Sequence, residues 1–282
     1  MILSTIAFSA PSADCQQVNN LALGLHLDKQ QPSIYSAVRV DCCSASGVTC
    51  DSSSRVIKID WSGMKLDGSI QDGAFPTSLT ELRLMNQSIA GPIPTLPESM
   101  QILYLGMNKF SGEIPKLPEG LKVAALFLNG LTGNLPTFPS TLSEFYVGYN
   151  AMNGELPKTL PSSLTTLHLN NNKFTGIFPG SFPENMTLVA NGNKFTGSLS
   201  MGKPNTVMIQ DNLVTDIKIQ DTSFLIACNI SDNPLAGSAN ALALKSKCAE
   251  DGFFPADVGF KSGAGFHAQT ALSLVLAMIY VI

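Results

Sequence analysis

Residues 164–176 read LTTLHLNNNKFTG and contain the pattern that decides the fold. Leu164, Leu167 and Leu169 carry an alternating apolar spacing that ends just before a polar run. Alternation with a period of two predicts a short strand with one buried face. Asn172 follows this strand, and Gly176 comes four residues later. The stretch therefore predicts a strand followed by a turn built around asparagine and glycine.

The asparagine of this element recurs at intervals of 19 to 22 residues. It stands at Asn108, Asn129, Asn150, Asn172, Asn193, Asn212 and Asn233. Met64 and Gln87 take its place in two earlier units, which makes about nine units. Since one such strand cannot bury a core alone, the units must stack into a parallel sheet. We expect the stacked side-chain amides to bond backbone groups of the turns and to form a ladder.

The return path of each unit is marked by proline, as in Ile93-Pro94, Ile114-Pro115 and Leu156-Pro157. Proline does not enter a helix interior, so the outer side is predicted to be extended or polyproline-like. One unit departs from the pattern, because Asp216 stands where the other units have glycine. The fold class is therefore predicted as an α/β-type repeat solenoid.

From about Val56 to Gly237 the chain resembles leucine-rich-repeat proteins of the LxxLxLxxNxLxGxIP kind. These are the plant-type receptor-like proteins and their relatives in fungi and protists. The resemblance implies a horseshoe with a parallel sheet on the concave face, an extended convex side and disulfide-capped ends.

The segment from Cys42 to Asp51 resembles the N-terminal cap of that family, with Ala45 where the cap usually has tryptophan. By this resemblance Cys15 pairs with Cys42, and Cys43 with Cys50. At the other end Cys228 and Cys248 bracket the last unit and are expected to clip a C-terminal cap. An even number of cysteines also indicates disulfides in an oxidising compartment rather than a metal site.

The predicted segments follow from these patterns. They are a signal peptide (1–13), a cysteine-containing N-terminal cap (14–54), the repeats (55–237), a C-terminal cap (238–250), a linker (251–262) and a C-terminal signal (263–282). The last 12 residues, Ala271 to Ile282, are apolar and too short for a membrane-spanning helix of about 20 residues. They resemble a glycosylphosphatidylinositol attachment signal with Ser262 as the lipid-bearing residue. The alternative is a membrane tail anchor.

The charge content of the chain excludes some classes of partner. Only 13% of the residues are charged and the net charge is -4, so nucleic acid is not an expected partner. Nothing in the sequence calls for a cofactor or a metal. Three sequons, at Asn86, Asn185 and Asn229, fit a glycoprotein of the secretory route.

Catalysis is not expected, because the chain has only His26, His168 and His267 as histidines. His26 is placed in a cap helix predicted from Gln16 to Leu27, and His267 lies in the C-terminal tail. The stacked neighbours expected for His168 are Tyr146 and Val189, which supply neither a nucleophile nor a carboxylate.

The concave face holds the candidate ligand-binding residues. Those predicted to cluster on units three to five, with His168 beside them, are Tyr104, Met107, Phe127, Leu128, Tyr146 and Tyr149. Exposed aromatic clusters of this kind are typical of recognition hot spots. The alternative is that Phe127 and Leu128 merely cover a poorly filled unit, because Ala124 stands where leucine is expected.

The sequence therefore predicts a non-enzymatic leucine-rich-repeat protein on the extracellular face of the plasma membrane or in the cell wall. It would bind an extracellular protein or glycan ligand, act with a signalling co-receptor, and meet the membrane through a lipid anchor. The alternative role is a structural wall or matrix protein, or an inhibitor of secreted hydrolases.

Overall fold

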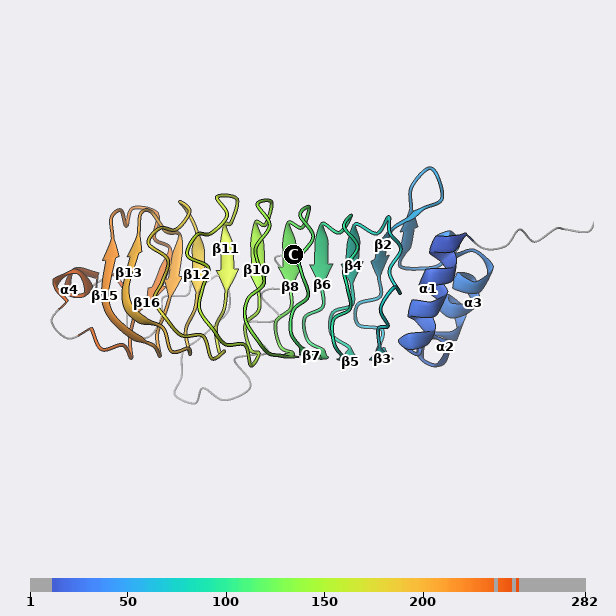
Figure 1. The fold of residues 1–282 in the computed structure, drawn as a ribbon, viewed down its shortest axis with the longest axis horizontal. Helices are drawn as coiled ribbons and strands as arrows, with labels where there is room; N and C mark the ends of the chain where they lie inside the picture. The colour runs from blue at the N-terminus through green and yellow to red at the C-terminus, as the bar shows by residue number, and fades with distance from the viewer. Residues whose placement is uncertain (1–11, 236–237, 245–246, 249–282) are drawn as a thin grey trace, which may run out of the picture.

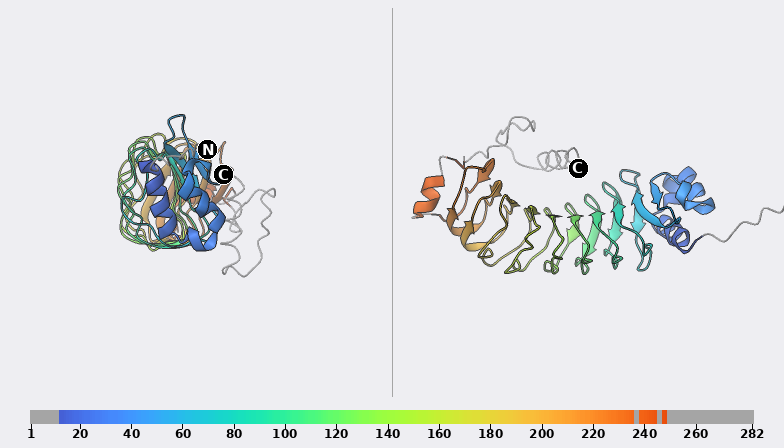
Figure 2. Two further views of the ribbon diagram at one scale, coloured as in Figure 1. Left: turned by 90° about the vertical axis from the view of Figure 1, so that its right-hand side faces the viewer. Right: turned by 90° about the horizontal axis from the view of Figure 1, so that it is seen from above.

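The structure is a computed structural model that describes residues 12–235, 238–244 and 247–248. These residues form a gently curved solenoid with helices at both ends (Figures 1 and 2). The predicted linker, the C-terminal signal with Ser262 and His267, and residues 1–11 of the predicted signal peptide lie outside the described residues. Within the described residues, no helix is long and apolar enough to cross a membrane.

One ten-stranded sheet runs the length of the solenoid. Its first strand, β1 (Val48–Cys50), is antiparallel to β2, and the other pairs are parallel. The parallel strands are β2 (Val56–Asp60), β4 (Glu81–Arg83), β6 (Ile102–Tyr104), β8 (Val123–Ala125), β10 (Glu144–Tyr146), β11 (Thr166–His168), β12 (Thr187–Val189), β14 (Thr206–Met208) and β16 (Ala227–Asn229). Each predicted unit contributes one strand, which confirms the repeat solenoid.

The return side is extended, as predicted, and it also carries short parallel strands that the prolines did not reveal. A four-stranded sheet and a two-stranded sheet form there from the residues after each turn. Their members are β3 (Asp67–Ser69), β5 (Ser88–Gly91), β7 (Lys109–Gly112) and β9 (Gly130–Leu131) in the first, and β13 (Thr196–Met201) and β15 (Leu213–Ile219) in the second. Backbone groups next to the turns thus find partners in adjacent units.

The core lies between the main sheet and the return side. Leu82, Leu103, Phe145 and Leu167 occupy the same register position in units two, three, five and six and are buried. In unit four, the same position is filled by the smaller Ala124 of β8, which is also fully buried. Stacking of identical positions therefore builds one continuous core.

The predicted asparagine ladder is present. Asn172 donates through Nδ2 to the carbonyl oxygens of Val147 (2.9 Å) and Leu169 (3.0 Å), and its Oδ1 accepts from the Met152 N–H (3.0 Å). The same bonds recur at the other six ladder positions, which are Asn108, Asn129, Asn150, Asn193, Asn212 and Asn233. Each amide donates to backbone carbonyls in two successive turns, so its hydrogen bonds join neighbouring units.

The N-terminal cap packs three helices, α1 (Ala13–Gly24), α2 (Leu27–Gln30) and α3 (Pro32–Val40), and the 3-10 helix η1 (Cys42–Ser44) against the first unit. Disulfides join Cys15 to Cys42 and Cys43 to Cys50. The side chain of Ser12 accepts the Cys15 N–H and caps α1, so the folded cap includes Ser12 and Ala13.

The helix predicted to reach Leu27 ends at Gly24 instead. A Cβ on Gly24 would lie 2.8 Å from the Ser69 carbonyl oxygen, so α1 meets β3 at a distance that requires glycine. His26 therefore lies in the turn after the helix, with φ at 51°, and its Nδ1 is 2.7 Å from Asp67 Oδ1. Trp61 fills the region near Ala45, where its indole N–H donates to the Ser46 carbonyl (3.2 Å).

The C-terminal cap contains α4 (Ala239–Leu244) and the disulfide between Cys228 and Cys248. Asp216, the residue that breaks the glycine pattern, accepts a hydrogen bond from the Ser238 hydroxyl. That bond lowers the pKa of Asp216 and ties the cap to β15. The departure in the repeat thus marks the place where the cap attaches.

Candidate ligand-binding face

The main sheet presents three columns of side chains on its concave face. The register of the strands brings Arg83, Tyr104, Ala125, Tyr146 and His168 side by side, as predicted. Residues of the turn after each strand continue the face. Its chemistry changes along the solenoid, from charged residues in units one and two, through apolar residues in units three to five, to amides in units six to eight.

The charged zone is an ion-pair network. Lys58 Nζ lies 2.9 Å from Glu81 Oε1, and the Arg83 guanidinium bonds the same carboxylate. Partial burial raises the pKa of Glu81, but the hydrogen bonds from Lys58 and Arg83 outweigh it and leave that pKa below its usual value. Arg83 also lies over the Tyr104 ring, 4.3 Å from its centroid. The charges of Lys58, Glu81 and Arg83 are therefore already paired within the chain.

The apolar zone is a second hydrophobic cluster, separate from the main core. It contains Tyr104, Ala125 and Phe127, and the partly buried side chains around them are Met85, Ile102, Met107, Val123, Leu128 and Tyr146. Ala124 belongs to the main core instead. Phe127 therefore does not fill the space left by Ala124, which argues against the covering role considered above.

Two residues expected to be exposed in this zone are buried: Tyr104 is 4% exposed and Phe127 is 3% exposed. A Cβ on Gly106 would lie 2.8 Å from the Phe127 ring, so this ring lies against the glycine of the preceding unit. The Tyr104 ring is covered by the Arg83 guanidinium of the neighbouring strand. Met107, Leu128 and Tyr146 are among the partly exposed members that form the accessible part of the cluster.

The residue just before each ladder position has a left-handed backbone in every unit. In units three to five this residue is Met107 (φ 60°), Leu128 (φ 52°) and Tyr149 (φ 56°). The remaining units place residues there that tolerate this conformation, namely Gly63, Asn86, Asn171, Gly192, Asp211 and Asp232. Large side chains at these positions cost backbone energy, and such strain is often found at functional sites.

Tyr146 and His168 join the apolar zone to the amide zone. Their rings meet edge to face with centroids 4.8 Å apart. The Tyr146 hydroxyl donates to Glu144 Oε2 (2.7 Å), and burial together with this carboxylate raises the pKa of the hydroxyl. Burial lowers the pKa of His168 to about 4, and its Nδ1 is buried with no hydrogen-bond partner among the described residues. His168 is therefore neutral near pH 7.

Amides dominate the face beyond His168. Its four carboxamide side chains, here called the amide surface, are Asn170, Asn171, Asn191 and Gln210. Asn170 is 6% exposed. A Cβ on Gly148 would lie 2.4 Å from the Asn170 Oδ1, so this amide packs against the glycine of the preceding unit. Gln210 Oε1 is buried with no hydrogen-bond partner in the described part of the chain. Because these side chains are not aromatic, the aromatic pattern of the sequence does not point to them.

The sequons differ in accessibility. Asn86 and Asn185 are exposed. Asn229 is 9% exposed, and its Oδ1 accepts the Ser231 N–H (3.0 Å). The first two side chains can therefore receive a glycan in the folded protein, whereas Asn229 is poorly placed for one.

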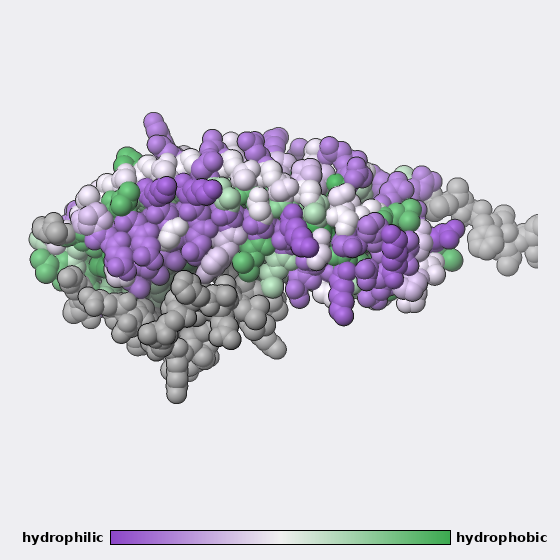
Figure 3. Space-filling view, turned by 90° about the horizontal axis from the view of Figure 1, so that it is seen from below, coloured by the Kyte–Doolittle hydropathy of each residue, from purple (hydrophilic) through white to green (hydrophobic). Residues whose placement is uncertain are grey.

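Figure 3 shows a lower face that is mostly hydrophilic and interrupted by small apolar areas.

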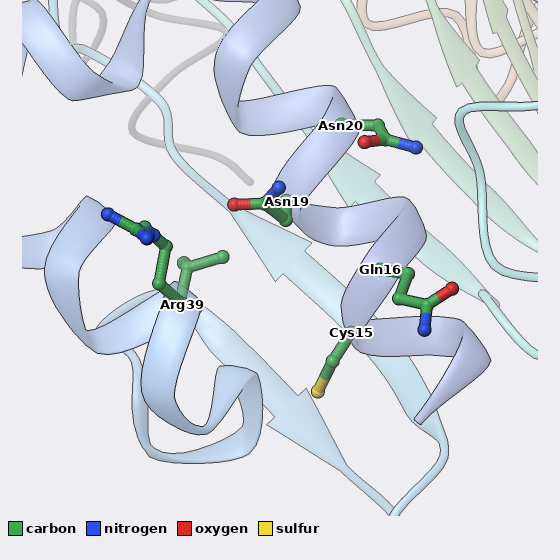
Figure 4. Close-up of a pocket in the computed structure, with 6 residues that line it drawn as sticks. Cys15, Gln16, Asn19, Asn20 and Arg39 are labelled. Carbon is green, nitrogen blue, oxygen red and sulfur yellow. The ribbon is translucent and has the colours of Figure 1, made fainter. Parts of the chain in front are cut away.

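A cavity of about 340 Å³ lies in the N-terminal cap, far along the chain from the concave aromatic residues. Asn19 points into the space between α1 and α3, across from Arg39, while Gln16 and Asn20 point to the other side of α1 (Figure 4). Among the described residues, the closest grouping of metal-ligating types is Cys15, Cys42 and Cys43 beside this cavity. All three sulfurs are in disulfides, so they offer no thiolate to a metal.

Comparisons with known proteins agree with this architecture. Residues 163–185 match the family model described as Leucine Rich Repeat. No curated protein matches the chain. The crystal structure of a plant ice-binding protein is similar, with a TM-score of 0.55 and 21% identity over 78% of this chain and 86% of that one.

A crystal structure of PEPR1-AtPEP1 has a TM-score of 0.50 and 20% identity over 78% of this chain and 45% of that one. A pollen receptor kinase 3 structure has 28% identity over 53% of this chain and 79% of that one, with a TM-score of 0.46. Stacked strands, an asparagine ladder and disulfide-capped ends define a leucine-rich-repeat solenoid. The family-model match to one repeat agrees with this fold, which extends over all nine units.

Proposed function

We propose that this protein is a non-enzymatic recognition module that binds an extracellular protein or glycan ligand through its concave face. The observation that carries the proposal is the second hydrophobic cluster on units three to five. Apolar side chains on the outer surface of a sheet add nothing to the main core, and such patches often mark interaction sites. Binding, rather than packing, best accounts for this cluster.

The left-handed residues support the same zone. Met107, Leu128 and Tyr149 are partly exposed beside the cluster and adopt a backbone that their side chains disfavour. Asparagine or glycine at these positions would stabilise the turn, as they do in other units. The strained residues coincide with the apolar zone, so their side chains have a use beyond folding.

Among the described residues, no constellation for catalysis lies near this face. His168 is flanked in register by Tyr146 and Val189, and its lowered pKa makes it a weak base. The described residues of the same column supply no hydroxyl nucleophile within hydrogen-bond distance of its ring. These features favour recognition over chemistry.

An extracellular place for this function is supported by the disulfides, which persist in oxidising compartments. We propose glycans at Asn86 and Asn185 and lipid attachment at Ser262, which would hold the solenoid at the cell surface. A protein anchored in this way would need a co-receptor to transmit a signal.

The test uses labelled full-length protein bound to intact cells of its native source. The triple variant Met107→Asn, Leu128→Asn and Tyr149→Asn removes the apolar side chains and keeps a residue type that tolerates the left-handed turn. We expect its apparent affinity to fall at least about 10-fold, which corresponds to about 1.4 kcal/mol. The matched control Asp232→Asn changes the equivalent position in unit nine and should bind as wild type does. Equal binding by the triple variant would show that the cluster is not the ligand site.

A further inference from the structure

We propose that the amide surface and the adjoining Tyr146, Tyr149 and His168 rings form a binding site for a neutral oligosaccharide. This inference rests on the proposed function and names the ligand class for the part of the face that the apolar cluster leaves out. It commits to one class, because the surface presents no cation for an acidic ligand and its amides and rings match the hydroxyls and C–H faces of a neutral sugar.

The side chains of the amide surface make no hydrogen bonds within the described chain. The seven ladder asparagines use both ends of their amides in backbone bonds, as Asn172 does. Within the described residues, no hydrogen bond holds the side chains of Asn170, Asn171, Asn191 or Gln210. The same residue type thus serves folding on one side of the turn and faces outward on the other.

Two polar side-chain atoms in this zone are buried without a hydrogen-bond partner in the described chain. They are Gln210 Oε1 and His168 Nδ1. A buried polar atom with no hydrogen bond costs stability, and native proteins carry few of them. Both side chains are partly exposed on the concave columns, in units six and eight, and a rotation of each would bring its unpaired atom to a ligand that crosses the strands between these units.

The described concave columns of this zone carry no cation. Between β10 and β14, the carboxylate of the described concave columns is Glu144, and it already accepts the Tyr146 hydroxyl. His168 is uncharged at neutral pH. Asp211 lies at the rim of the eighth unit with an exposed side chain. An anionic ligand would find no cation on these columns to pair with, whereas an uncharged ligand needs none.

The amide and aromatic side chains of this zone complement the chemistry of a sugar. A carboxamide offers both a donor and an acceptor, as does each hydroxyl of a sugar, so the two can form paired bonds. Sugar rings also have apolar C–H faces, which can pack against the Tyr146, Tyr149 and His168 rings. A row of amides beside a row of rings therefore matches a chain of neutral sugars better than it matches a folded protein surface, whose charged groups it could not pair.

The experiment titrates the purified full-length protein with cellohexaose, xylohexaose and chitohexaose, and follows binding by calorimetry. Oligogalacturonic acid and a mixture of random peptides are titrated as charged and peptide probes. We expect at least one neutral hexamer to bind, and the double variant Asn191→Ala and Gln210→Ala to weaken it at least 10-fold. The control Asn153→Ala removes an exposed amide from the return side and should leave affinity unchanged.

Binding of a neutral hexamer that the double variant does not weaken would overturn the proposed site. Binding of only the acidic oligomer or only peptides would overturn the ligand class, and so would no binding of any neutral hexamer at millimolar concentration. The proposed function fails separately, if the triple variant at Met107, Leu128 and Tyr149 binds native cells normally. Loss of cell binding by that variant with no sugar binding would reject this inference alone.

Discussion

Asn191 and Asn193 lie two residues apart in the same turn, yet they do different things. Asn193 points inward, donates to the carbonyls of Leu169 and Ala190, and accepts from the Phe174 N–H. Asn191 points outward on the concave face, and its side chain has no hydrogen bond within the described chain. The difference teaches that position in the repeat, rather than residue type, separates residues that build the solenoid from those available to a ligand.

The sharpest test of this comparison replaces each asparagine with leucine. Asn193→Leu leaves the Phe174 N–H without a partner and removes one of the two side-chain amide donors from the Leu169 and Ala190 carbonyls, so we expect the unfolding free energy to fall by about 2–4 kcal/mol. Asn191→Leu should change it by no more than about 1 kcal/mol. Urea denaturation of both variants measures the contrast. Equal losses would mean that the outward amide also supports the fold.

A second prediction concerns His168, which belongs to the outward set. Burial holds its pKa at about 4, whereas the unfolded chain titrates near 6.5, so the unfolded state binds more protons between these values. Its contribution to stability is complete above pH 6.5 and is lost as the pH falls toward 4. The loss is on the order of 2–3 kcal/mol.

The measurement compares unfolding free energies of wild type and His168→Phe at pH 7 and pH 4.5. Phenylalanine keeps a ring beside Tyr146 and removes the titrating group. The variant should lose less stability than wild type on acidification. Parallel pH profiles would place the His168 ring in solvent rather than in the face.

The smallest expected effect is a gain. Leu128→Asn places a residue that tolerates the left-handed backbone where leucine is strained, and should stabilise the fold by about 0.5–1 kcal/mol. The reverse change, Asn171→Leu, tests the same position one zone away and should destabilise by a similar amount. Thermal unfolding of both variants checks this. If Leu128→Asn is destabilising, the leucine contributes packing that outweighs the backbone cost.

The sequence predicts the solenoid well because its signals are local and repeated. The period of two around Leu167 and the recurring asparagine define strand, turn and stacking before any tertiary contact is known. The same register places Tyr146 beside His168, which the structure confirms. A repeat of this kind leaves one way to bury its apolar face.

What the sequence could not reveal depends on contacts between units. The burial of Phe127 follows from the glycine at position 106 in the neighbouring unit, and no pattern within one unit contains that information. The end of α1 at Gly24 depends on its close approach to Ser69 in the first unit. Asp216 looked like a flaw in the repeat, and it became an attachment point only once Ser238 was placed beside it.

The uniform register of the parallel strands has a consequence for how such a protein can change. Neighbouring strands are about 4.8 Å apart, and every unit presents the same interface to the next. Duplicating or deleting one whole unit between Tyr146 and Gln210 would therefore shift the rings and the amides by one strand step while both caps keep their contacts. The array then behaves as a molecular ruler, in which the number of units between two zones sets the length of ligand that can reach both.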